Sequence, residues 1–133
     1  MKTNYKEFTI SAEFDGKKVA PWDNMNDRHS RVTVKNNETG KRTSFDFWGS
    51  IREPRLETDY SLLNAFYCFV SDGLSAVDGF ENFCSEFGYD TDSRRAEKIF
   101  KACKRSEEKL FRVTGYSVDM MYDFINELQE VAE

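Results

Sequence analysis

Residues 8–14 read FTISAEF, and this stretch decides how the first half of the chain is interpreted. Its apolar side chains occupy every second position, which places them on one face of a β-strand and the polar side chains on the other. The pair Asp15-Gly16 that follows is typical of a turn. Residues 20–28 are polar and predict a loop. The alternation therefore predicts a strand with one buried face.

Two more strands are expected before residue 58. Val32 and Val34 alternate with polar residues, and residues 36–40, NNETG, have the composition of a hairpin turn. In the third strand we expect Phe45 and Phe47 to point inward. The opposite face of that strand holds Ser44, Asp46 and Trp48. The first half thus predicts a three-stranded antiparallel sheet with one apolar face, which needs helices packed on it.

The second half changes to a helical period. Apolar residues recur at spacings of three and four and predict about four helices. These cover residues 59–74, capped by Asp59, then 80–87, then 92–113, and a last helix after Ser117. We therefore expect one α+β domain over residues 1–133, with strands mainly in 1–58 and helices mainly in 59–133. Its core is expected to join Phe8, Ile10, Phe45 and Phe47 to Phe66, Phe69 and Ile99.

Composition restricts the class of protein. The chain has 133 residues, of which 15% are aromatic, and this is sufficient for one hydrophobic core. Its apolar runs are shorter than the roughly 20 residues of a membrane span, and residues 1–7 lack the apolar segment of a signal peptide. Cys68, Cys84 and Cys103 show no paired spacing, so free thiols are expected. These features indicate a cytoplasmic protein without a membrane partner.

The sequence contains no recognisable catalytic or metal-binding motif. The single histidine, His29, falls in a polar stretch that is expected to be a loop. Asp90 and Asp92 resemble the opening of a calcium-binding loop, but Arg94 stands where the next oxygen ligand would be needed. Helix capping explains the same two aspartates. We therefore expect no enzyme activity, no metal and no cofactor.

Charge is distributed unevenly along the chain. Residues 1–58 contain 11 basic and 9 acidic residues, whereas residues 59–133 contain 8 and 15. Helical spacing groups two sets on single helix faces. The basic row comprises Arg94, Lys98, Lys101, Arg105, Lys109 and Arg112, and the acidic face comprises Asp119, Asp123, Glu127 and Glu130. Each set is compatible with a solvated helix surface. As functional surfaces, the basic row would bind phosphate and the acidic face would dock on a basic groove. The two sets could also pair with each other.

The segment FENFCSEFGYDTDSRRAEKIFKAC at residues 80–103 resembles a segment of small uncharacterised proteins encoded by phages and prophages. The strand FDFWGS at residues 45–50 is also similar to theirs, and the resemblance covers mainly residues 42–112. It implies a mobile-element protein that acts inside a bacterial host cell, and it carries no catalytic residues. Small acidic phage proteins of this size often inhibit bacterial immunity stoichiometrically, as anti-CRISPR proteins do. Extending this function to the present chain is an analogy with that class of proteins.

Two functional hypotheses follow. In the first, a phage or mobile-element protein inhibits a bacterial defence complex or nuclease by protein binding through its acidic face. In the alternative, a phage accessory protein binds nucleic acid through its basic row. A sequence pI near 5.0 disfavours the alternative, because nucleic-acid-binding domains are usually basic. The targeted complex and the oligomeric state are left open.

Overall fold

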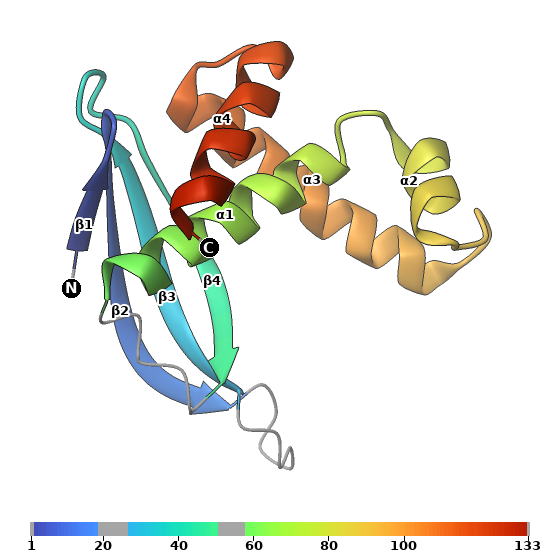
Figure 1. Ribbon diagram of the computed structural model, residues 1–133. Helices are drawn as coiled ribbons and strands as arrows, with labels where there is room; N and C mark the ends of the chain where they lie inside the picture. The colour runs from blue at the N-terminus through green and yellow to red at the C-terminus, as the bar shows by residue number, and fades with distance from the viewer. Residues whose placement is uncertain (1, 19–26, 51–57, 133) are drawn as a thin grey trace.

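The computed structural model describes residues 2–18, 27–50 and 58–132. Within these ranges the chain forms an antiparallel sheet in the order β1-β2-β3-β4 and four helices, so the α+β class is confirmed. The sheet packs against α1, α3 and α4, whereas α2 packs on α3. The strands are β1 (Lys2–Tyr5), β2 (Phe8–Lys18), β3 (Asp27–Asn36) and β4 (Arg42–Ser50). The helices are α1 (Asp59–Ser75), α2 (Phe80–Phe87), α3 (Arg94–Thr114) and α4 (Val118–Ala132). In Figure 1, α1 lies across the sheet with α4 beside it, whereas α2 lies at the far end of α3.

The prediction of three strands is wrong, because β1 forms a fourth strand at the edge of the sheet beside β2. The connecting turn consists of Lys6 and Glu7, which lack the glycine or asparagine of a typical hairpin turn. Lys6 adopts a left-handed conformation with φ 51°, which is unfavourable for a residue with a side chain. Its ammonium group forms an ion pair with Glu127 of α4. This long-range contact helps to stabilise a turn that the local sequence does not predict.

Strand β2 is also longer than predicted. Asp15 and Gly16 do not end it, and instead the pairing register with β3 shifts between Phe14 and Lys18. Gly16 has φ 71°, a conformation that glycine adopts easily and that accommodates such a bulge. His29 lies inside β3 rather than in a loop. The predicted loop over residues 20–28 is wrong at its end, since Asp27 and Arg28 belong to β3. Residues 19–26, which include the rest of that loop, and residues 51–57 lie outside the described residues.

The four predicted helices are confirmed with small shifts at their ends. Thr58 caps α1 in place of Asp59, because its hydroxyl accepts a hydrogen bond from the Ser61 amide (3.1 Å). The Ser61 hydroxyl in turn accepts from the Thr58 amide (3.2 Å), which completes a capping box. Gly88 and Gly115 end α2 and α3 as predicted.

The main core lies between the sheet and the helices α1, α3 and α4. Phe8 of β2, Phe66 of α1 and Phe124 of α4 form a triangle, with ring centroids 5.6–5.7 Å apart and tilted edge-to-face contacts. Phe8 and Phe66 are fully buried. The main core comprises Phe8, Ile10, Val32, Val34, Leu62, Ala65, Phe66, Phe69, Val70, Leu74, Leu110, Met121, Phe124 and Leu128. Three segments far apart in the sequence therefore meet at one aromatic centre.

The predicted core is correct for Phe8 and Ile10, only partly correct for Phe45 and Phe47, and wrong for Ile99. Phe45 stacks on Phe69 with centroids 4.3 Å apart, yet Phe45 and Phe47 are only half-buried at the margin of the main core. Ile99 instead packs in a second, smaller cluster at the end of the molecule where α2 meets α3. This tip cluster comprises the buried Phe83, Cys84 and Ala96 with Phe80, Tyr89, Ile99, Phe100 and Cys103 around them. The long helix α3 thus contributes to two separate cores.

Candidate functional surfaces

The four carboxylates of the acidic face are exposed along α4. The helix buries Met121, Phe124 and Leu128 against the main core, so the positions between them point outward. Its sequence VDMMYDFINELQEVA contains these four acids and no lysine or arginine. Exposed apolar side chains, Met120 and Tyr122, lie among them. The structure thus provides an acidic surface with apolar contacts, and its role in partner binding stays a prediction.

A hollow of about 230 Å³ opens on this acidic surface. Its lining comprises Lys6, Tyr116, Met120, Asp123, Phe124 and Glu127. Lys6 forms the ion pair with Glu127 and lies 5.8 Å from the centroid of the Phe124 ring. The Tyr116 hydroxyl donates to Glu7, and burial together with the charges of Glu7, Glu38 and Glu127 raises the pKa of Tyr116 far above its usual range. Two carboxylates of α4 therefore line this hollow, and Glu7 and Glu38 add negative charge near its Tyr116.

The basic row is divided by its surroundings, although its members follow one face of α3. Arg94 and Lys98 are exposed near the tip cluster. Lys101 forms an ion pair with Glu97 (3.0 Å). Farther along, the Lys109 ammonium group donates to the Ser44 carbonyl oxygen (3.2 Å) on β4. Arg105 and Lys109 line a hollow beside this strand, so the row does not present one uniform cationic surface.

The ion pairs described in residues 2–18, 27–50 and 58–132 do not join the basic row to the acidic face. Glu127 is paired with Lys6 from the β1–β2 turn, and Lys101 is paired within its own helix. The described ion pairs therefore do not show the two charged surfaces pairing with each other.

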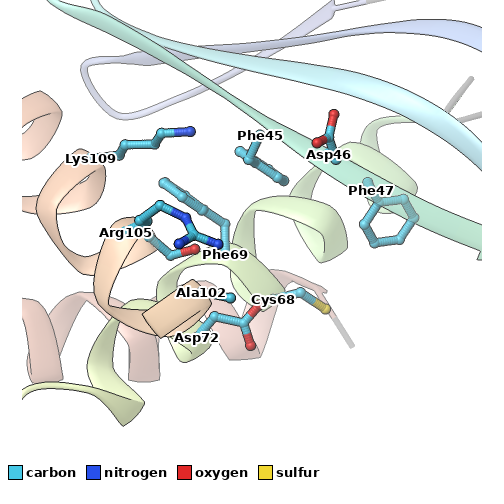
Figure 2. A pocket seen from close by; sticks show the side chains of 10 residues that line it. Phe45, Asp46, Phe47, Cys68, Phe69, Asp72, Ala102, Arg105 and Lys109 are labelled. Carbon is cyan, nitrogen blue, oxygen red and sulfur yellow. The ribbon is translucent and has the colours of Figure 1, made fainter. Parts of the chain in front are cut away.

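A hollow of about 250 Å³ lies between β4, α1 and α3 (Figure 2). Its lining comprises Phe45, Asp46, Phe47, Cys68, Phe69, Asp72, Ala102, Arg105, Ser106 and Lys109. Partial burial raises the pKa of the Asp72 carboxyl. Burial, and to a smaller extent the charge of Asp72, raises the pKa of the Cys68 thiol. Sequence reasoning did not find this hollow, because three separate elements form it.

His29 is the residue whose environment differs most from the prediction. It is buried in β3 on the sheet face opposite the helices, and its ring lies 4.7 Å from that of Trp48. Its Nδ1 is 2.7 Å from Asp15 and its Nε2 is 2.8 Å from Asp46. Burial opposes the charged form, but the hydrogen bonds to the two carboxylates outweigh it and raise the pKa of His29. Because both ring nitrogens face carboxylates, the charged imidazolium can donate to both, so this geometry favours the charged form of His29.

Within the described part of the chain, no group of three or more histidine, cysteine, aspartate or glutamate side chains could hold a metal ion. The three cysteines are free. Among the helices that are described, none is sufficiently long and apolar to cross a membrane.

Comparisons with models of protein families, with curated proteins and with solved structures found no match to this chain. The resemblance to phage-encoded proteins therefore stays a prediction.

Proposed function

We propose that the protein is a stoichiometric inhibitor that binds a basic surface of a bacterial defence complex, without catalysis, inside the bacterial cell. The observation that carries the proposal is α4, which exposes four carboxylates and no cation. A surface of this kind is complementary to a groove lined by lysine and arginine. Proteins that handle nucleic acid have such grooves, because they neutralise phosphate.

The apolar side chains on the acidic face add a second component to binding. Met120 and Tyr122 are about half exposed beside Asp119 and Asp123. Tyrosine and methionine are enriched at protein interfaces, whereas purely solvated surfaces favour small and charged residues. In this proposal charge steers the encounter and the apolar contacts retain the partner.

The bacterial defence target comes from the resemblance to phage proteins and from the class analogy with anti-CRISPR inhibitors. Physically, an acidic surface that occupies a nucleic-acid groove competes with the nucleic acid for it. The alternative, nucleic-acid binding by the basic row, has a less uniform cationic surface, since Lys101 is paired with Glu97 and both Arg105 and Lys109 line a hollow beside β4.

The test uses charge reversal at positions that do not support the fold. The variant Asp123→Lys/Glu130→Lys changes two exposed acids, whereas Glu127 is avoided because it holds Lys6. The matched control is Arg94→Glu/Lys98→Glu, which reverses two exposed cations of α3. Tagged forms of all three proteins are used to capture partners from a bacterial lysate, and the captured complex is then purified and assayed for nuclease activity.

We expect the wild type and the control to capture one defence complex and to inhibit it with saturation at an equimolar ratio. The acidic-face variant should lose capture. Association of the wild type should slow as the salt concentration rises, because salt screens the attraction between charges beyond a Debye length of about 8–10 Å. Inhibition far below equimolar amounts would contradict stoichiometric binding. If the wild type captured nucleic acid without a protein partner, and the Arg94→Glu/Lys98→Glu variant did not, the result would support nucleic-acid binding by the basic row instead.

A further inference from the structure

The C-terminal half of α3 and the edge strand β4 form a cationic seam. We define this seam by Arg105, Lys109 and Arg112 on α3 and by Thr43 and Ser44 on β4. Two hollows adjoin here and share Arg105 and Lys109. One is the hollow of about 250 Å³ above α1, and the other, of about 450 Å³, is lined by Arg105, Glu108, Lys109 and Arg112. The second hollow is within the size range of small-molecule sites, and the first is slightly below it.

The cations of the seam have neutral partners. Lys109 donates to the Ser44 carbonyl oxygen (3.2 Å), and Arg112 donates to the Thr43 hydroxyl (3.5 Å). None of the three cations takes part in an ion pair within the described ranges. In the preceding turns, Lys101 and Lys104 are each neutralised by a glutamate. Three cations outside these ion pairs therefore lie together at the seam beside one carboxylate, Glu108, although the chain as a whole has a formal net charge of -5.

The two ends of the first hollow differ in chemistry. Arg105, Lys109 and the hydroxyl-bearing Ser106 lie on α3, whereas Asp72 comes from α1 (Figure 2). Asp46 of β4 also lines the hollow, but its carboxylate contacts His29 and Arg31 on the opposite face of the sheet. Phe45 and Phe47 provide half-buried apolar surface in the same hollow. A second anionic group on the ligand would be repelled by Asp72, whereas a neutral group with hydrogen-bond donors would suit the Asp72 carboxylate and the rings.

We propose that the seam binds a phosphate ester of nucleotide size. The phosphate would be held by Arg105 and Lys109, with Arg112 at its outer side, because a guanidinium group matches phosphate oxygens and an ammonium group adds a point charge. The neutral part of the ligand would lie toward Phe45 and Asp72. This site is distinct from the acidic face of α4 and does not depend on the proposed inhibitor function.

The test measures binding of AMP, adenosine and inorganic phosphate to the full chain by calorimetry and by NMR amide shifts. We expect saturable binding of AMP, weaker binding of inorganic phosphate and no binding of adenosine. Shifts should be confined to the amides near residues 43–47 and 105–112. Arg105→Gln should weaken AMP binding by about tenfold or more, because one charge-assisted hydrogen-bond fork is lost. Arg105→Lys should restore part of that loss.

Arg94→Gln is the matched control, since it removes an exposed cation from the other end of the same helix. It should leave AMP binding unchanged, and neither substitution should alter partner capture through the acidic face. Absence of saturable AMP binding at millimolar concentration would overturn the proposal. Equal weakening by Arg94→Gln and Arg105→Gln would also overturn it, because it would indicate non-specific attraction along the helix. A single-stranded oligonucleotide that binds more tightly than AMP and responds equally to both substitutions would indicate nucleic-acid backbone binding instead.

Discussion

The main core and the tip cluster are built by different kinds of contact, although α3 belongs to both. The main core joins Phe8, Phe66 and Phe124, which come from three distant parts of the chain. The tip cluster lies within residues 80–103, so its members are neighbours in sequence. Long-range burial couples the sheet to the helices, whereas local burial orders α2 on the end of α3. We therefore expect global unfolding to be governed by the main core and the tip to open separately.

Phe66→Ala tests the role of the main core and should cause the largest loss of stability. The side chain is fully buried and contacts the rings of Phe8 and Phe124, so its removal leaves a cavity at the centre of the main core. The free energy of unfolding should fall by about 3–5 kcal/mol, which is a large share of a typical stability of about 5–15 kcal/mol. Chemical denaturation followed by circular dichroism measures this loss.

Phe47→Ala is the control for Phe66→Ala at the margin of the same core. Because Phe47 is only half-buried, the cost should be about 1–3 kcal/mol. An equal loss from both substitutions would contradict the main core as described.

The crossing of α1 and α3 offers a sharper test, Gly73→Ala. A Cβ at this buried glycine would lie 2.8 Å from Leu110 Cδ2 and 3.3 Å from the Glu107 Cα. Alanine normally favours a helix, but here the two helices would have to separate, and we expect a loss of about 1–3 kcal/mol. Ser71→Ala in the same helix is the control and should be close to neutral. A stabilised Gly73→Ala protein would show that the helices are not so closely packed.

Phe83→Ala tests the tip cluster directly. Phe83 is nearly buried and contacts the rings of Phe87, Tyr89 and Phe100. Because these contacts are local, the substitution should change the global free energy of unfolding by only about 1 kcal/mol. Hydrogen exchange should show loss of protection in α2 while the amides of α1 and β2 remain protected. Simultaneous loss in all three elements would mean that the two cores unfold as one.

The smallest expected effect concerns pH and is confined to the sheet. The pKa of His29 is raised above 6.5, so its stabilising contribution is complete below that value and is lost as pH rises through the raised pKa. The pKa values of Asp15 and Asp46 are lowered from 3.8, so their contribution is lost only as pH falls below that value.

Thermal unfolding of the wild type and His29→Gln at several pH values measures this effect. The wild type should lose part of its advantage as pH rises above 6.5, because the imidazolium loses its proton as pH passes the raised pKa of His29. The variant should show no such change in that range. Parallel pH profiles of the two proteins would contradict a charged His29.

Much of the fold could be predicted from local patterns. Alternation placed Phe8, Ile10, Val32 and Val34 on the buried face of the sheet, and helical spacing located four helices with ends at Gly88 and Gly115. The acidic face could also be assigned, because i, i+4 spacing on a helix fixes which side chains share a face. These features depend on residues within a few positions of one another, and a sequence displays such relations directly.

Other features were decided only when distant elements met. Lys6 and Glu127 are 121 positions apart, yet their ion pair stabilises the turn that creates β1. His29 appeared to belong to a loop until pairing with β2 and β4 brought Asp15 and Asp46 to its two nitrogens. The cationic seam likewise requires β4 to lie against α3. Sequence periodicity determined which face of each element is buried, whereas tertiary packing determined which atoms meet across elements, because that depends on register and crossing geometry that no local spacing encodes.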